Sequence, residues 1–198
     1  MRKALQVILL LTITVTRLSA YRILYAEQYY RLYHLHFYQY PDDSMENIFY
    51  LEQALKADFC NPLYALAWIE GHREWAHYRN LFRMHVNLKL VELYLTLGSK
   101  YDKMAAYFYN APWKEDNLKS LDLAEQVYRT ALAYWQEARR WAVKEARSRY
   151  HLEEIQKWED ECSRILTGDL DYREIIAGHL RRLKKVRQDF QRMDKNTY

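Results

Sequence analysis

The sequence predicts an all-α protein, elongated in shape and built from antiparallel helical hairpins with two unusually long helices. The chain has 198 residues, of which 50% are hydrophobic, so it can bury a substantial core. Its 4 Gly and 3 Pro are too few for the regular turns of a β-sandwich or barrel, and they leave long uninterrupted runs. Glycine-rich phosphate loops and a glycine-framed nucleophile elbow are also missing, which disfavours most enzyme classes.

Turn residues and capping residues divide the chain after residue 20 into six expected helices. Asp43 and Glu46 are placed as a capping box for the second helix. Gly98 is expected to close the third, and Asp169 or Asp171 to begin the last. The fifth run contains no Gly or Pro over about fifty residues. The expected helices span about 21–39, 44–58, 63–97, 101–109, 117–166 and 171–193.

Residues 1–20 have the pattern of a secretory signal peptide. Basic residues precede an apolar run from Ala4 to Val15, and the residues that follow end in the small residue Ala20, after which we expect cleavage. The run is shorter than the ~20 residues of a spanning helix. An uncleaved membrane anchor and an ordinary amphipathic first helix are the alternatives. Residues 21–198 are expected to form a single helical domain, periplasmic or secreted.

Charge and cysteine content add little about partners. Without residues 1–20, the formal net charge falls from +4 to +1, which gives no general attraction to nucleic acid. Cys60 and Cys162 have no metal-site spacing. In an oxidising compartment they could form a disulfide, or each could be a separately buried thiol.

One stretch resembles a junction between tetratricopeptide repeats. Ala54 matches the small residue on which neighbouring helices pack, and Asn61-Pro62 matches the turn between repeats. Phe59 stands where the family usually has a proline, which is a departure from the pattern.

A second stretch resembles the second helix of such a repeat. Ala124, Tyr128 and Ala131 reproduce the alanine–aromatic–alanine spacing, in which the alanines permit close helix approach and the aromatic ring fills the gap. The 77 residues between Ala54 and Ala131 exceed the ~68 of two regular periods, so the array is irregular. The resemblance implies a tetratricopeptide-like array of helical hairpins.

The combination of signal peptide, tyrosine-rich degenerate repeats and long helices is also similar to small periplasmic repeat proteins of spirochaetes, including components of the flagellar collar. This resemblance implies a non-catalytic scaffold or adaptor in an envelope-associated assembly. Its partners would be other proteins, with a membrane surface as a further option and no nucleic acid, small-molecule substrate or cofactor. The alternatives are a membrane-anchored helical bundle and a metal-binding helical protein.

Aromatic and basic side chains are the candidates for partner contact. The aromatic residues of the third expected helix either pack in the core or line a concave groove. The basic helix 171–193 either caps the array or attaches to an acidic partner or an anionic membrane. The candidate contact residues are Tyr25, Tyr29, Tyr33, Trp68, Trp75, Tyr101, Tyr107, Tyr109, Arg181, Arg182 and Lys185.

A metal site has weak support. His72 and His77 are five residues apart, so they do not share a helix face. Glu70, Glu74 and His77 do share a face, as either a low-affinity ligand cluster or a solvated polar surface. We therefore expect no catalytic, metal-binding or cofactor-binding residue.

Overall fold

The all-α prediction is confirmed by the computed structural model, which describes residues 22–106 and 111–193. Within those residues the protein has helices and no β-strand. Two short 3-10 helices, η1 (Pro62–Tyr64) and η2 (Glu153–Ile155), interrupt the connections. The α-helices are α2 (Ala26–Gln39), α3 (Ser44–Lys56), α4 (His72–Tyr101), α5 (Ala111–Glu145), α6 (Gln156–Thr167) and α7 (Tyr172–Arg192).

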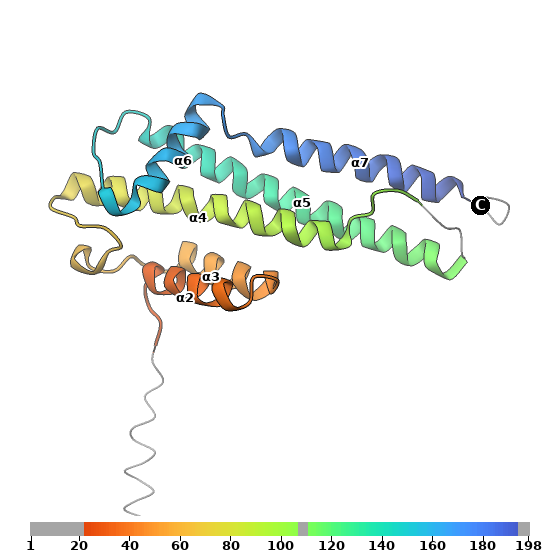
Figure 1. Cartoon of the computed structure of the whole chain (residues 1–198), viewed down its shortest axis with the longest axis horizontal. Helices are drawn as coiled ribbons and strands as arrows, with labels where there is room; N and C mark the ends of the chain where they lie inside the picture. The colour runs from red at the N-terminus through yellow and green to blue at the C-terminus, as the bar shows by residue number, and fades with distance from the viewer. Residues whose placement is uncertain (1–21, 107–110, 194–198) are drawn as a thin grey trace, which may run out of the picture.

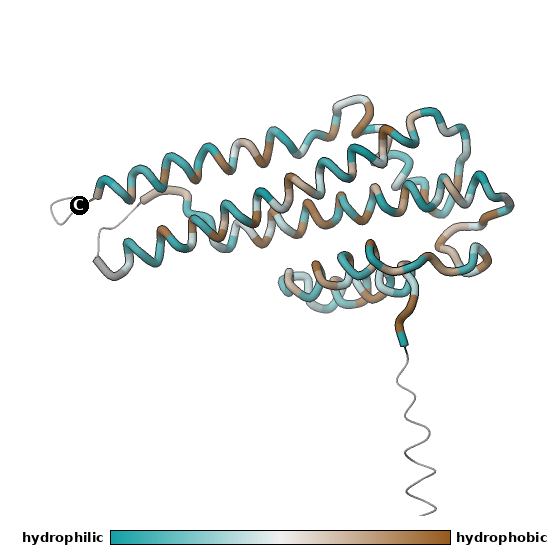
Figure 2. Tube along the Cα trace, turned by 180° about the vertical axis from the view of Figure 1, so that it is seen from behind, coloured by the Kyte–Doolittle hydropathy of each residue, from teal (hydrophilic) through white to brown (hydrophobic). Residues whose placement is uncertain are grey.

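Three long rods dominate the molecule (Figure 1). Helices α4 and α5 lie side by side and run in opposite directions, and α7 lies along α5. The short α6 crosses one end of the α4–α5 pair, while α2 and α3 form a hairpin layer against α4. Hydrophilic residues predominate along α7 (Figure 2), as its position at the edge of the molecule requires.

The core of the long pair is a seam of alternating small and large side chains on α5. The positions alternate in steps of three and four residues, the spacing of knobs-into-holes packing. Each is at most 1% exposed, and alanines between aromatic residues let α4 and α7 approach closely. The seam consists of Leu121, Ala124, Tyr128, Ala131, Trp135, Ala138 and Ala142.

Helix α4 is the central element. Five consecutive residues from Met84 to Leu88 are buried, so its middle is covered on every side by α3, α5 and α6. A helix covered in this way has no polar face to show, which is why its amphipathic pattern is weak.

The third helix begins later than predicted. Helix α4 starts at His72, after Gly71 in an extended conformation, and residues 65–71 are irregular. The amide N–H groups of this segment find tertiary acceptors: Leu66 donates to the Tyr78 hydroxyl at 3.3 Å, and Trp68 donates to Glu154 at 3.2 Å. Because these acceptors are remote in sequence, the local pattern did not reveal the break.

The end of that helix also differs from prediction. Gly98 lies inside α4, which continues to Tyr101, and it is buried. The expected short helix at 101–109 is absent over its described part, since residues 102–106 are irregular and 107–110 lie outside the described residues.

The predicted run from 117 to 166 is two helices. Helix α5 ends at Glu145, and α6 begins at Gln156 without any Gly or Pro between them. The Glu159 side chain accepts from the Leu152 amide at 2.8 Å, and Ser148 contacts His77. Tertiary contacts therefore hold this connection.

Two predicted helix starts are confirmed. The Asp43 side chain accepts from the Glu46 amide at 3.2 Å, and Asp171 accepts from the Arg173 amide at 2.9 Å. Gly168 ends α6 with φ +88°, a conformation that favours glycine. No helix in the described part of the chain is both long and apolar enough to cross a bilayer.

Candidate functional site

The alanines and turn residues singled out by the repeat resemblance lie inside the fold. Ala54 is 2% exposed, while Ala124, Tyr128 and Ala131 are fully buried in the α4–α5–α7 core. The Asn61 side chain accepts from the Leu63 amide at 3.0 Å, so it caps η1 and positions the chain that leaves α3.

The aromatic candidates divide by exposure. Trp68 is 75% exposed and Tyr25 is 38% exposed, whereas Tyr29, Trp75 and Tyr101 are half-buried. Tyr33 is 4% exposed and packs on the rings of Tyr30 and Phe37, so the expectation that it contacts a partner is corrected by its burial. Tyr107 and Tyr109 lie outside the described residues.

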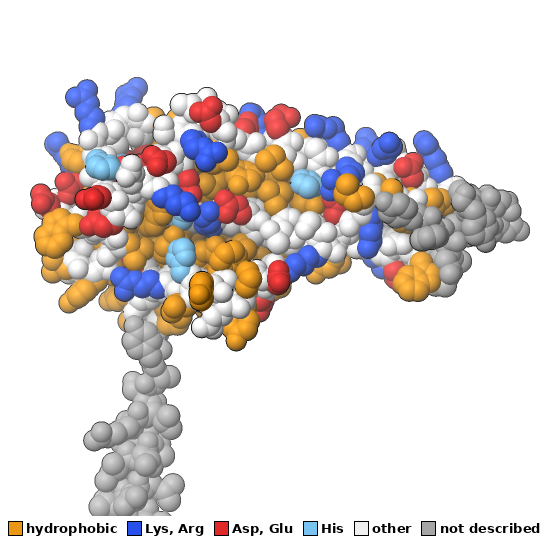
Figure 3. Space-filling model, in the orientation of Figure 1, with side chains coloured by type: hydrophobic (Ala, Val, Ile, Leu, Met, Phe, Trp, Pro, Cys, Tyr) orange, Lys and Arg blue, Asp and Glu red, His pale blue; other side chains and the backbone are white. Residues whose placement is uncertain are grey.

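The basic candidates on α7 also divide. Arg181 and Lys185 are exposed, and Figure 3 shows Lys and Arg side chains projecting along the edge formed by α7. Arg182 instead forms an ion pair with Asp102, whose side chain is only 4% exposed. Arg182 is therefore a structural residue that fixes α7 to the end of α4.

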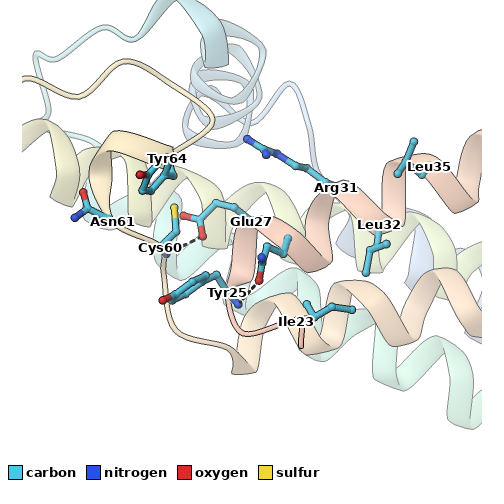
Figure 4. Close-up of a pocket in the computed structure, with 10 residues that line it drawn as sticks. Ile23, Tyr25, Glu27, Arg31, Leu32, Leu35, Cys60, Asn61 and Tyr64 are labelled. Atoms are coloured by element: carbon cyan, nitrogen blue, oxygen red, sulfur yellow. Dashed lines mark hydrogen bonds between the residues drawn. The ribbon is translucent and has the colours of Figure 1, made fainter. Parts of the chain in front are cut away.

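The clearest concave feature is a groove beside α2, which we call the α2 groove (Figure 4). It has a volume of about 500 Å³ and lies between the outer face of α2 and the segment that leads into η1. Leu32 and Leu35 come from α2 and Tyr64 from η1, so the walls are mainly apolar. The full lining is Ile23, Tyr25, Glu27, Gln28, Arg31, Leu32, Leu35, Cys60, Asn61 and Tyr64.

A buried carboxylate fixes the floor of this groove. Glu27 is 2% exposed and lies in the first turn of α2, where the helix dipole favours negative charge. Its oxygens accept from the Cys60 amide at 2.9 Å and from the Tyr78 hydroxyl at 3.4 Å. Burial, with Glu27 alongside, raises the pKa of Cys60 to about 12, which favours the thiol over the thiolate.

Exposed apolar side chains are concentrated on the α2–α3 layer and on the segment that connects it to α4. Of the eighteen large hydrophobic side chains that are exposed among the described residues, eleven lie between residues 24 and 68. Figure 3 shows hydrophobic side chains over the α2–α3 layer. The eleven are Leu24, Tyr25, Leu35, Phe37, Tyr38, Tyr40, Met45, Phe49, Leu63, Tyr64 and Trp68.

The suspected metal-ligand cluster does not assemble. Glu74 accepts from the Glu70 amide at 2.8 Å, and Glu70 precedes the helix. His77 points elsewhere: its Nδ1 lies 2.8 Å from Glu145 and its Nε2 lies 3.3 Å from Glu159. The described residues contain no group of three or more His, Cys, Asp or Glu able to hold a metal ion.

The alternative of a solvated His77 is also wrong, since the residue is only 6% exposed. Burial alone would lower its pKa, but hydrogen bonds that His77 donates to Glu145 and Glu159 hold the pKa above its ordinary value. Through these two contacts His77 joins α4 to the end of α5 and the start of α6.

The pKa of a second buried histidine, His85, is shifted in the opposite direction. His85 is 2% exposed, stacks on Trp158 and lies 2.8 Å from the Tyr30 hydroxyl, with Glu161 hydrogen-bonded to its other nitrogen. Burial lowers the pKa of His85 despite Glu161. These hydrogen bonds join α2, α4 and α6 through the interior of the fold.

Sequence reasoning missed Glu27, Arg31, Leu32 and Leu35. A signal for the last two was present, because Tyr25, Leu32 and Leu35 recur at helical spacing on the face of α2 opposite Tyr30. No local signal marked Glu27, since its partners lie 33 and 51 residues away.

The fold thus defines an all-α protein whose long helices carry an additional hairpin layer. Residues 73–193 match the family described as Domain of unknown function (DUF8513). The match covers more than half of the 198 residues, so the chain belongs to the DUF8513 family. No curated protein and no solved structure matches the chain. The matched segment coincides with α4 to α7, so α2, α3 and the connection to α4 lie outside it.

Proposed function

We propose that the protein is a non-catalytic adaptor that docks another protein on the α2 groove. The observation that supports this most is the concentration of exposed apolar side chains on residues 24–68, outside the DUF8513 segment. Exposing large apolar side chains to water is unfavourable, and a contiguous patch of them is typical of an interaction surface. Tyrosine and tryptophan suit such a surface because they combine apolar area with a polar tip.

The groove indicates the chemistry of its occupant. Its walls take apolar side chains, and Glu27 at its floor is already satisfied by its two donors. Arg31 is exposed on the groove wall, and no carboxylate of the described residues lies within ion-pairing distance of it. The occupant we propose is a protein segment with an apolar stripe and a carboxylate placed opposite Arg31.

The proposal also concerns the compartment in which the adaptor acts and its helical architecture. The signal-like residues 1–20 favour an exported protein, so we place the adaptor in an envelope-associated assembly. The α2–α3 and α4–α5 hairpins, with buried alanines between helices, are consistent with a degenerate tetratricopeptide-like array, although α4 and α5 are much longer than helices of that family. The resemblance to spirochaete periplasmic proteins makes the flagellar collar the particular assembly to test.

The test compares charged substitutions at matched exposed positions. Leu35→Asp and Tyr64→Asp place carboxylates in the groove, where the wild-type side chains are 64% and 72% exposed. Val143→Asp is the control, since Val143 is 62% exposed on α5. Native electrophoresis of gently solubilised envelopes should show wild type and the control in a large complex and the groove variants released from it. Co-migration of all four proteins would refute the proposal.

A further inference from the structure

A second surface, lined by different residues, combines aromatic rings with positive charge between α4 and α5. Arg83 lies between two rings, with its guanidinium carbon 4.9 Å from the centroid of Phe59 and 4.8 Å from that of Trp141. Two further cations approach Trp141: Lys144 at 4.8 Å and Arg140 at 5.1 Å. The guanidinium carbon of Arg79 lies 5.6 Å from the centroid of the Trp75 ring. We use the name Trp141 cluster for the four cations Arg79, Arg83, Arg140 and Lys144 together with the rings of Phe59, Trp75 and Trp141.

The positive charge of the cluster is poorly compensated within the fold. Among the described residues, no carboxylate lies within ion-pairing distance of Arg79, Arg83 or Lys144. Arg140 pairs with Glu137, but both side chains are largely exposed, so this pair contributes little. The nearby Glu145 is already engaged by His77 and Asn80.

Two of these arginines are half-buried, which makes the lack of a counter-charge costly. The Nε atom of Arg79 is buried and has no hydrogen-bond partner. Burial and the neighbouring Arg79 lower the pKa of Arg83 below its ordinary value. Buried polar groups normally have partners, so an external acceptor would remove an unfavourable arrangement.

The geometry selects the kind of acceptor. The guanidinium carbon of Arg83 lies over the rings of Phe59 and Trp141, and the planar fork of a guanidinium matches a carboxylate in a bidentate pair. The cations occur as i, i+4 pairs on α4 and α5, about 6 Å apart along each helix, with the helices about 8–10 Å apart. Such an array is wider than a single small anion and fits several carboxylates along a chain.

We propose that the Trp141 cluster binds an acidic segment of a partner protein. Nucleic acid is the less favoured occupant, because stacking of bases requires free ring faces, and cations already lie over Trp141. The site extends the proposed function by giving the adaptor a second contact, but it stands whether or not the α2 groove docks a partner.

The test measures binding of a fluorescent Asp/Glu-rich dodecapeptide to the purified full-length protein. A matched Asn/Gln peptide, tripolyphosphate and a dodecamer of single-stranded DNA serve as competing probes. Wild type should bind the acidic peptide, with affinity falling as salt is added. The R79Q/R83Q variant should lose at least about tenfold in affinity, and Arg83→Lys should lose part of it because lysine lacks the planar fork.

Two more variants separate the site from general charge and from misfolding. R140Q/K144Q removes exposed cations of the cluster without disturbing the interior and should also weaken binding, whereas K56Q/K119Q removes the same charge at exposed positions elsewhere and should not. Leu35→Asp should bind the peptide normally, which separates this site from the groove. The proposal is overturned if wild type does not bind, if K56Q/K119Q loses as much affinity as the cluster variants, or if DNA or tripolyphosphate binds more tightly than the peptide.

Discussion

Tyr128 lies directly over Gly98, so that a Cβ atom at Gly98 would come within 2.5 Å of Cε1 of the tyrosine ring. The ring is fully buried, its hydroxyl donates to Asp102 at 3.0 Å, and His179 stacks on it at a centroid distance of 4.6 Å. Gly98 is therefore required by the close approach of α5 to α4.

This contact predicts opposite effects for two mid-helix glycines. Gly98→Ala should destabilise the protein by about 1–3 kcal/mol, because Tyr128 has no free space to move into. Gly178→Ala should stabilise it by about 0.5–1 kcal/mol, since its nearest neighbour is an Arg181 side-chain atom at 4.0 Å and alanine favours the helix. Urea unfolding of both variants measures the difference, and equal effects would contradict the packing described.

His77 predicts a pH-dependent contribution to stability. Its pKa is raised in the folded state above the ordinary 6.5, so its stabilisation is fully present below pH 6.5 and is lost as pH rises through the folded pKa. The free-energy difference between wild type and His77→Gln should therefore shrink as the pH rises above 6.5. His72→Gln, at an exposed position of the same helix, is the control. A difference for His77→Gln that grows with pH would show that the histidine is held neutral.

Substitution of Arg182 should destabilise the protein much more than substitution of Lys185, although both are basic residues of α7. Arg182→Gln leaves the carboxylate of Asp102 buried without its cation and should cost on the order of 3 kcal/mol. Lys185→Gln changes an exposed side chain and should stay within about 0.5 kcal/mol of wild type. Thermal unfolding of the two variants is a sufficient measurement, and similar melting temperatures would be inconsistent with the Asp102 pair.

The two cysteines should be free and unreactive in the folded protein. Both are buried and unpaired, and burial raises the pKa of Cys162 to about 11 and that of Cys60 to about 12. A thiol reagent should label neither residue in native protein and both after unfolding without reductant. Labelling of no thiol in the unfolded chain would reveal a disulfide instead.

Local signals predicted much of the fold. Asp43 and Asp171 cap helices where the sequence placed them, and Gly168 ends α6, because a cap depends on a few neighbouring residues. Gly98 and the connection after Glu145 were misread because tertiary packing decided them. A glycine inside a helix and a break without glycine or proline are visible only when the partner helix is in place.

The sequence predicted which types of residue form the candidate site, but not which residues come together in it. The sequence predicts exposed aromatic residues, and Trp68 and Tyr25 are exposed. The burial of Tyr33 and the hydrogen bond between Cys60 and Glu27 could not be predicted, because both depend on how α2 packs against segments distant in the sequence.

Site-specific photo-crosslinking in intact cells tests the central claim most directly. A photoreactive residue at Tyr64, in the α2 groove, should form one covalent adduct with a partner protein, through a segment that combines apolar residues with an acidic one. The same residue at Val143 on α5 should form none. Adducts of equal yield at both positions, or none at Tyr64, would contradict the account of the α2 groove as a docking surface.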